Sequence, residues 1–378
     1  MTDEPTGTDP AATKTAELSC AGCGEIVFPS EDFCENCGRR LREGAAAPAG
    51  GPGPARREGA TTKQYRGGAD PARACAHCAS RTIDAEGYCG ACGMRQPAER
   101  DHVEITVPAG AAGVSDRGRR YARNEDALAL TGHATGVAAV VSDGVGSSQR
   151  PEEASRAAAD TGAAELAARL DAGTDPQEAT RLAALKAAAA VAALAGSPGE
   201  APSCTYVSAV VHGGAVTVGW IGDSRVYWIA AQEPPEDAAD AGVEADTADL
   251  AELTGSAQLT EDDSWAAFMV AEGALTEAEA EAHPNAHVIT AWLGADAGEV
   301  HPHVRTYRPS GPGTLLVCSD GLWNYFPAPA ALAALVDGSA DALGTARTLV
   351  RHALDAGGRD NITVAVIPLP TPSTEQPR

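Results

Sequence analysis

The chain has 378 residues, of which 44% are hydrophobic and 4% aromatic, and its formal net charge is −24 at pH 7. Such acidity disfavours partners that are themselves negatively charged, so nucleic acid and anionic membranes are not expected to bind. The sequence has no run of about 18 apolar residues that would predict a membrane-spanning helix. Its first ten residues, MTDEPTGTDP, are acidic and polar, unlike a secretory signal peptide. We therefore expect a cytoplasmic protein.

Eight of the ten cysteines form two sets with the same spacing, C-x2-C-x10-C-x2-C. Two cysteines so spaced can present both thiolates to one ion, and four thiolates describe a structural zinc site with no open coordination position. A thioredoxin-like redox motif is the alternative, but its strand–helix–strand surroundings are absent from the sequence. We predict two structural Zn²⁺ ions, held by Cys20, Cys23, Cys34 and Cys37 and by Cys75, Cys78, Cys89 and Cys92.

The two cysteine sets and the composition around them divide the chain. The segment between the sets is rich in Pro, Gly and Ala, which is typical of a flexible linker. Residues 230–252 are acidic and contain two prolines, which is typical of a mobile surface insertion. In order, we predict a disordered N-terminus (1–17), zinc ribbon 1 (18–42), the linker (43–72), zinc ribbon 2 (73–97), one large domain (102–368) and a disordered tail (369–378).

Strand-like and helix-like stretches alternate throughout the large domain. Short apolar runs predict strands, and longer alanine-rich stretches predict helices. The predicted strands are 137–142, 205–211, 215–220, 225–229, 287–292, 314–319 and 361–367. The predicted helices are 152–170, 176–195, 262–273, 276–282, 328–336 and 340–356.

Acidic residues stand at the ends of several of these strands. Two strands run into an aspartate followed by glycine, at Asp143 and at Asp320. Asp360, Asp223 and the pair Glu125–Asp126 lie beside other strand-like runs. A single Asp-Gly is more often a turn former, but five such positions together predict carboxylates that converge on one point.

Carboxylates that converge in a partly buried site repel one another unless a cation compensates their charge. Oxygen donors without His or Cys select Mg²⁺ or Mn²⁺ over zinc. Two such ions bridged by one carboxylate can generate a hydroxide nucleophile and stabilise the displacement of a phosphoryl group. The acidic positions therefore predict a binuclear centre for phosphate ester chemistry.

Six motifs carry a resemblance to a known family: SDRGRRYARNEDA, VVSDGVGS, GDSRVYW, LTEDDSW…EGALTEAEAEAHP, CSDGLW and GRDNITVAV. In this order, over roughly residues 110–368, they resemble the metal-dependent protein serine/threonine phosphatases (PPM family, type 2C) in their bacterial form. The resemblance implies an α+β fold, an α-β-β-α sandwich of two antiparallel sheets flanked by helices, with the metals at one edge. It also implies direct attack of a metal-bound hydroxide on phosphoserine or phosphothreonine, with no phosphoenzyme.

The resemblance also implies the roles of the acidic residues. Asp143 would bridge two Mn²⁺ or Mg²⁺ ions, and Asp320 and Asp360 would complete the first metal site. Asp223 with Asp320 resembles a third, weaker site, and residues 259–284 resemble the flap beside the cleft. The catalytic residues would be Asp143, Asp320 and Asp360, and the full Mn/Mg-binding set would be Glu125, Asp126, Asp143, Gly144, Asp223, Asp320 and Asp360.

Two positions depart from the family pattern. Many members carry a phosphate-binding arginine where this chain has Tyr121, and eukaryotic members carry a histidine, the suggested general acid, where it has Val145. Any nearby guanidinium can hold a phosphate through two hydrogen bonds, so we expect a neighbouring arginine to substitute: Arg119, Arg120 or Arg123. The remaining cysteines, Cys204 and Cys318, are expected to be small buried strand residues.

These observations favour a phosphatase acting on phosphorylated proteins, whose zinc ribbons serve as a docking or regulatory module. The expected partners are phosphoprotein substrates, within a Ser/Thr kinase signalling pathway, and the expected state is a monomer. The alternatives are a catalytically weak pseudophosphatase and a zinc-ribbon adapter. The adapter would bind protein in preference to nucleic acid, because the overall charge is strongly negative.

Overall fold

The computed structural model describes residues 18–19, 26–27, 75, 78, 80–84, 87–93, 96, 98–197, 200–232, 250–336 and 340–369. The chain divides into two compact units, Met1–Ala98 and Glu99–Arg378. In the first unit, β1 (Leu18–Ser19) pairs with β2 (Ile26–Val27). Four parts of the prediction lie outside the described residues: the cysteines of the first ribbon, the N-terminus and linker, residues 233–249 of the insertion, and residues 370–378 of the tail. Leu369, predicted to begin the tail, ends the last strand instead.

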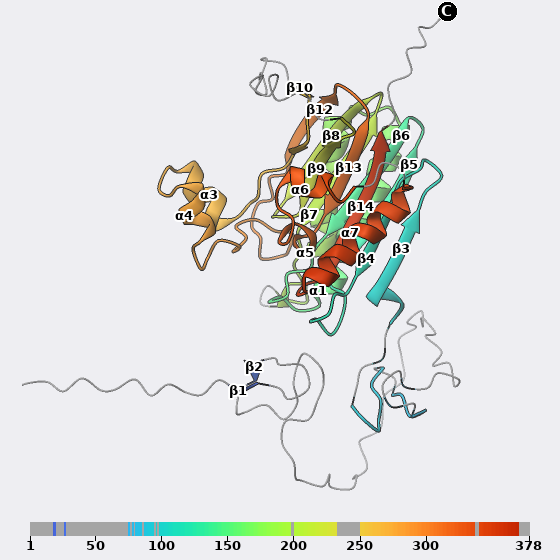
Figure 1. The fold of residues 1–378 in the computed structure, drawn as a ribbon, viewed down its shortest axis with the longest axis vertical. Coiled ribbons are helices and arrows are strands. Elements are labelled where there is room, and N and C mark those ends of the chain that lie inside the picture. The colour runs from blue at the N-terminus through green and yellow to red at the C-terminus, as the bar shows by residue number, and fades with distance from the viewer. Residues whose placement is uncertain are drawn as a thin grey trace, which may run out of the picture. The chain divides into compact units, whose positions relative to one another are not determined.

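Two six-stranded sheets form the centre of the second unit (Figure 1). In spatial order, the first sheet contains β10 (Leu250–Leu253), β12 (His303–Pro309), β8 (Ala215–Ile221), β7 (Tyr206–His212), β6 (Gly136–Ser142) and β5 (Ala127–His133). The second contains β11 (Ala257–Gln258), β9 (Arg225–Ala230), β13 (Gly313–Cys318), β14 (Ile362–Leu369), β4 (Ala112–Asp116) and β3 (His102–Thr106).

The strand pairs are antiparallel except for one. β10 runs parallel to β12 at the edge of the first sheet, with Leu250 opposite Thr306. The predicted sandwich of two antiparallel sheets flanked by helices is confirmed, and this one edge pair is the exception to antiparallel pairing. Because β10 is not joined to β12 by a hairpin turn, no turn constrains the two strands to opposite directions. The last residues of the predicted insertion, 250–252, belong to this strand.

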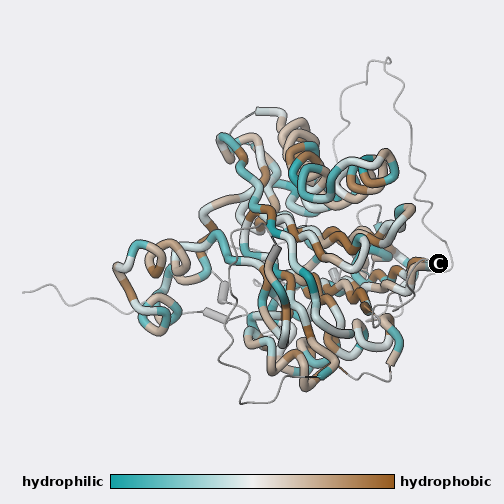
Figure 2. The backbone as a smooth tube through the Cα atoms, turned by 90° about the horizontal axis from the view of Figure 1, so that it is seen from above, coloured by the Kyte–Doolittle hydropathy of each residue, from teal (hydrophilic) through white to brown (hydrophobic). Residues whose placement is uncertain are grey.

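Side chains that alternate along the strands build two apolar layers on opposite faces of the first sheet. On β6, Val137, Ala139 and Val141 point into the core between the sheets, where Trp220 and Trp228 are also buried. The intervening Ala138 and Val140 point to the opposite face, against helices. This period of two is what an extended strand dictates. Figure 2 shows hydrophobic stretches gathered along the strands inside the domain.

Helices cover the outer face of each sheet. α1 (Pro151–Asp171) and α2 (Pro176–Ala192) pack on the first sheet through small alanine side chains and Leu166. The short η1 (Glu99–Asp101) precedes β3. The second sheet is covered by α5 (Asp320–Trp323), α6 (Pro329–Ala333) and α7 (Ala342–Ala356). Within the described ranges, no helix is both long and apolar enough to cross a membrane.

α3 (Trp265–Ala271) and α4 (Glu277–Glu281) stand apart from the sandwich as a small lobe (Figure 1). Each begins at a capping side chain: Ser264 accepts from the Ala267 N–H, and Thr276 forms a reciprocal capping box with Glu279. These caps explain why the helix predicted from residue 262 begins only at Trp265. The lobe lies within the predicted flap.

One predicted strand is wrong, and several strands were not predicted. Residues 287–292 form no strand, and Ile289 makes only an isolated bridge to Ser264. The segment is rich in β-branched residues but forms no ladder, so tertiary context overrides its β propensity. Six strands of the second unit were not predicted: β3, β5, β10 and β11 lie at sheet edges, and β4 and β12 each lie next to an edge strand.

Leu166 tests the packing of the alanine-rich helix layer, because it is a large and fully buried side chain of α1. We expect Leu166→Ala to lower the free energy of unfolding by about 2–5 kcal/mol, since the small alanines around it cannot fill the cavity. Chemical denaturation followed by circular dichroism would measure this. Arg156→Ala, at an exposed position of the same helix, should change stability by no more than about 0.5 kcal/mol.

Candidate metal centres

The predicted acidic residues stand at one end of the two sheets because of how the strands are paired. Asp143 follows β6, and Asp126 precedes β5; their neighbours Ser142 and Ala127 face each other across the β5–β6 pair. In the second sheet, Cys318 of β13 is opposite both Arg225 of β9 and Val364 of β14. This register carries Asp320, Asp223 and Asp360 to the same end of the sandwich.

The carboxylates interact with one another electrostatically. Burial and then repulsion from Asp126, Asp320, Asp360 and Asp223 raise the pKa of Asp143 well above its usual range. Burial and the charges of Asp320 and Asp126 raise the pKa of Asp360 to about 8. Burial raises the pKa of Asp126 to about 6, although Ser319 donates a hydrogen bond to it at 2.7 Å. The cluster is thus costly to ionise by itself.

Thr205, the residue directly before β7, fixes Asp143 through hydrogen bonds. The backbone N–H of Asp143 donates to Thr205 Oγ1 at 3.0 Å, and its carbonyl accepts from the Thr205 N–H at 2.8 Å. Ser142 Oγ donates to the Thr205 carbonyl at 2.6 Å. The aspartate is therefore held by a rigid pair of strands.

Asn361 ties together the loop that carries Glu125. Its Oδ1 accepts from the Glu125 N–H at 2.7 Å, and its Nδ2 donates to the carbonyls of Arg117 and Arg123. Asp360, next to it, accepts from the Asn361 N–H at 2.8 Å. The sequence placed Asn361 at the start of a strand, but its role in tying this loop had no sequence signal.

Gly321, the residue after Asp320, lets the backbone there lie against the backbone of Asn361. A Cβ built at Gly321 would collide with the carbonyl oxygen of Asn361. Only glycine therefore allows the first turn of α5 to lie this close to the start of β14.

Two carboxylate oxygens of the cluster have no partner within the protein. Oδ1 of Asp126 and Oδ1 of Asp320 are buried, and neither has a hydrogen-bond partner. Buried carboxylate oxygens are normally paired, and repulsion between them is relieved by divalent cations, for which carboxylates are the preferred ligands. The residues present therefore fit Mn²⁺ or Mg²⁺.

The other predicted site residues have varied surroundings. Asp223 is buried, and its pKa is raised by burial and by the charges of Asp320 and Asp262. Burial also raises the pKa of Glu125, against the opposing charge of Arg123, whose Nε lies 3.3 Å from it.

The three arginines expected to bind phosphate lie in one loop. Arg123 also pairs with Glu152 at 2.9 Å, Arg119 pairs with Asp355 at 3.2 Å, and Arg120 is exposed. Tyr121 is close enough to the cluster for four of its carboxylates to raise the phenol pKa, after burial, which is the main cause. The position where the family carries arginine therefore faces the acidic centre.

The two remaining cysteines are unsuited to nucleophilic chemistry. Both Cys204 and Cys318 are buried in or beside strands, and burial raises the pKa of each thiol to about 12. A thiol with such a pKa carries almost no thiolate at neutral pH. The expectation that they are structural residues agrees with this environment.

A salt bridge anchors the base of the predicted flap. Arg225 donates two hydrogen bonds to Asp262, at 2.9 and 2.7 Å, and its guanidinium lies 3.6 Å from the centre of the Trp323 ring. Asp263 accepts from the Gly222 N–H at 2.9 Å and lies 2.9 Å from His303 Nε2. The flap therefore begins from a fixed point beside Asp223.

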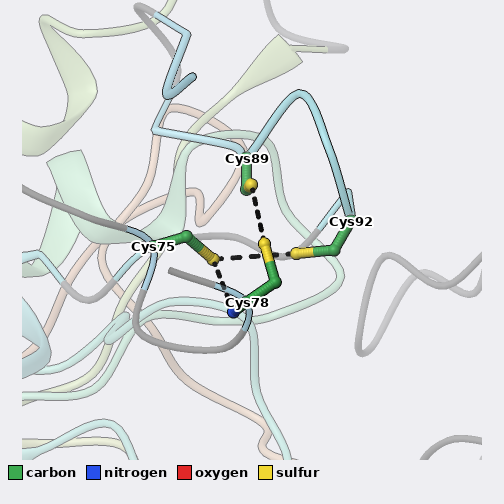
Figure 3. Close-up of side chains that lie close together, drawn as sticks. All are labelled: Cys75, Cys78, Cys89 and Cys92. Atoms are coloured by element: carbon green, nitrogen blue, oxygen red, sulfur yellow. Dashed lines mark hydrogen bonds between the residues drawn. The ribbon is translucent and has the colours of Figure 1, made fainter. Parts of the chain in front are cut away.

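The second cysteine set forms a compact cluster in the first unit (Figure 3). The Sγ atoms of Cys75, Cys78, Cys89 and Cys92 all lie within 4.8 Å of one another, with separations of 3.7 Å for Cys75–Cys92 and 3.6 Å for Cys78–Cys89. A tetrahedral ion with Zn–S distances of about 2.3 Å needs sulfur atoms about 3.8 Å apart. The four sulfurs therefore fit a zinc ion.

Two N–H groups also approach the sulfur of Cys75. The backbone N–H of Cys78 donates to it at 3.4 Å, and Gln96 Nε2 donates at 3.2 Å. Such donors orient a ligand and stabilise thiolate charge around a metal. Among the described residues, this is the one group of three or more ligating side chains whose donor atoms all lie within 4.8 Å of one another.

Comparisons with known proteins agree with this geometry. The profile of the family described as protein phosphatase 2C matches residues 115–356. Protein phosphatase PhpP of Streptococcus pneumoniae serotype 2 is 38% identical over 110 residues, which are 29% of this chain and 44% of that protein. The match thus spans less than half the length of this curated relative.

Solved structures resemble the second unit over most of its length. The crystal structure of the serine/threonine phosphatase PstP/Ppp of Mycobacterium tuberculosis is 26% identical, with a TM-score of 0.55, covering 69% of this chain and 98% of that chain. A crystal structure of the PstP catalytic domain in complex with two manganese ions is 25% identical, with a TM-score of 0.51, covering 70% of this chain and 97% of that chain.

The raised pKa values predict how the cation-free protein responds to pH. Asp126 and Asp360 have pKa values of about 6 and about 8 in the folded protein, against about 4 when unfolded. The folded state therefore holds more protons than the unfolded state between pH of about 4 and about 8, and its stability falls as pH rises through this range. Thermal melting at pH 5 and pH 8 would measure this fall.

Bound cations and the removal of a carboxyl group should both reduce this fall in stability. Added Mn²⁺ should raise the melting temperature more at pH 8 than at pH 5, because it binds the ionised carboxylates. Asp143→Asn removes a carboxyl group whose own pKa is raised in the folded protein, so it should flatten the pH dependence without cation. An equal Mn²⁺ effect at both pH values would contradict a cation site built from these carboxylates.

If the four sulfurs bind zinc, replacing one of these cysteines should remove that ion. Cys89→Ser should reduce the zinc bound to the full chain by one equivalent, as measured by elemental analysis, because a tetrahedral site loses a thiolate. Cys318→Ala, which removes a buried strand cysteine, should leave the zinc content unchanged. Unchanged zinc content in Cys89→Ser would contradict this site.

Proposed function

The chain belongs to the protein phosphatase 2C family, and on that basis we propose that it is a metal-dependent protein serine/threonine phosphatase. It would hydrolyse phosphoserine and phosphothreonine in phosphorylated proteins. The observation that carries the proposal is the convergence of buried carboxylates, with unpaired oxygens on Asp126 and Asp320, at one end of the sandwich. A structural role alone does not explain buried acidic groups that repel one another.

Each acidic residue has a proposed part in this centre. Asp143 would be a ligand of two cations. Asp320 and Asp360 would bind the first of them, and the Gly144 carbonyl would bind one of the two. Glu125 and Asp126 would serve the second cation, and Asp223 with Asp320 a third. Bound cations of this kind neutralise phosphoryl oxygens and lower the pKa of a water. A PstP structure holds two manganese ions, which supports Mn²⁺ or Mg²⁺ here.

Substrate phosphate needs a positive group beside the cations. Arg123 is the best placed of the three arginines for this role, because it already lies 3.3 Å from Glu125. Its second ion pair, to Glu152, would hold the guanidinium in position. Arg119 and Arg120 are the other candidates. Val145 offers no proton to a leaving group, so this chain needs a donor from elsewhere.

The N-terminal unit would act as a docking or regulatory module held by zinc. Small ribbons of this kind fold through metal binding, and the acidic chain favours protein partners over nucleic acid. A cytoplasmic location, a monomeric state and a place in a Ser/Thr kinase pathway accompany this proposal as predictions. The intact acidic set weighs against the pseudophosphatase alternative.

Activity toward p-nitrophenyl phosphate tests the proposal. The full chain should hydrolyse it in the presence of Mn²⁺ and stop when the ion is chelated. Asp143→Asn should lower kcat by about 100-fold or more, because it removes a charge that holds both cations, while circular dichroism stays unchanged. Asp160→Asn, on an exposed position of α1, should retain full activity. An active Asp143→Asn protein would contradict the proposed centre.

A further inference from the structure

A cavity of about 650 Å³ lies next to the acidic centre and is not used by the reaction described above. One side is formed by Val145 and Gln149, just after Asp143, and another by Ser203. The remaining side comes from residues 287–296, including His287, Trp292 and Asp296. The volume is typical of a ligand pocket. We call this cavity the Asp296 pocket.

Contacts link the pocket to the metal-binding end of the sandwich. The Val145 N–H donates to the Ser203 carbonyl at 2.9 Å, two residues from Asp143. On the other side, the ring centre of the exposed His287 lies 6.0 Å from that of Trp323, which belongs to the helix that begins at Asp320. A peptide whose phosphorylated residue reaches the acidic centre would therefore place neighbouring side chains at this pocket.

The carboxylate of Asp296 is fixed in place but still accessible. Its Oδ1 accepts hydrogen bonds from Trp292 Nε1 at 3.1 Å and from Ser203 Oγ at 3.3 Å, and the residue is exposed. A Cβ built at Gly294 would lie 2.6 Å from Asp296 Oδ1 and 2.7 Å from Ser203 Oγ, so only glycine permits this arrangement. Both bonds use one oxygen, which leaves Oδ2 to accept from a ligand.

The charges around the pocket favour a cation. Among the described residues that line it, Asp296 and His287 are the ionisable ones, and neither lysine nor arginine is present. The nearest arginine in sequence, Arg150, is engaged with Glu153 at 2.7 Å and with the Leu194 carbonyl at 2.9 Å. A carboxylate beside an indole suits a guanidinium, which can bond to the first and stack on the second.

We propose that the Asp296 pocket binds an arginine or lysine side chain of the phosphoprotein, close in sequence to the phosphorylated residue. Asp296 is then a specificity-determining residue, and Trp292 positions its carboxylate. This inference rests on the proposed phosphatase function. It names the class of substrate as phosphoserine or phosphothreonine flanked by basic residues.

Phosphothreonine peptides that differ at one position test the proposal on the full chain with Mn²⁺. Each peptide carries one arginine, at one of the three positions on either side of the phosphothreonine, in an otherwise neutral sequence. We expect at least one arginine position to raise kcat/KM about tenfold over the neutral peptide, which corresponds to about 1.4 kcal/mol. Glutamate at the same position should not raise it.

Variants of Asp296 decide whether the pocket is responsible. Asp296→Asn keeps an oxygen for Trp292 and Ser203 but removes the charge, so the ratio of kcat/KM between arginine and neutral peptides should fall to about one. Asp296→Lys should reverse the preference toward the glutamate peptide. Glu299→Gln, which removes an exposed carboxylate that does not line the pocket, should keep the arginine preference.

Several results would overturn the inference. These are an absence of arginine preference in the wild-type chain, an unchanged preference in Asp296→Asn, and an equal fall for all peptides and for p-nitrophenyl phosphate. If the wild-type chain hydrolyses no phosphate ester, the phosphatase function itself has failed. Fluorescence anisotropy of an arginine-containing peptide with wild-type chain and Asp296→Asn then decides the pocket separately, because equal binding would overturn it.

Discussion

Repulsion among buried carboxylates is the constraint around which the second unit is organised. Burial raises the pKa of Asp126, Asp143, Asp320 and Asp360, and the charges of neighbouring carboxylates raise it further for Asp126, Asp143 and Asp360. Such a group of charges is unfavourable, so rigid elements must hold the carboxylates in place against their repulsion. The two sheets and the hydrogen bonds from Thr205 and Asn361 supply that rigidity. The fold thus holds together carboxylate oxygens, such as Oδ1 of Asp126 and of Asp320, that no protein group pairs with and that a cation can bind.

Much of this organisation could be predicted from the sequence. The strand-end positions of Asp143 and Asp320 and the ordered motifs around them were enough to predict the sandwich and the convergence of acidic groups. The sandwich was implied by the resemblance of these motifs to a known family. The individual elements came from local patterns: buried apolar runs predicted β6 and β13, and long alanine-rich segments predicted α1 and α2. Such patterns are local, so a single sequence reveals them.

The features that were missed depend on contacts between distant segments. The sequence HVITAW at 287–292 has high β propensity, yet it lines a cavity and makes only an isolated bridge from Ile289 to Ser264, so tertiary context overrides propensity. The parallel pairing of β10 with β12 joins residues more than 50 positions apart in the sequence, such as Leu250 and Thr306. The part played by Asn361 in tying the Glu125 loop depends on a partner 236 residues away in sequence. None of these leaves a periodic signal.

The close approach at Gly321 has a consequence for how such a centre can vary. The separation between the loops that bear Asp320 and Asp360 is set there by backbone meeting backbone, with no side chain between them. A larger residue would force the two loops apart, even in a protein that keeps every acidic group. Affinity for divalent ions can therefore be lost by mutation at a position that has no chemistry of its own, and a complete set of ligands in a related sequence is not sufficient to infer turnover.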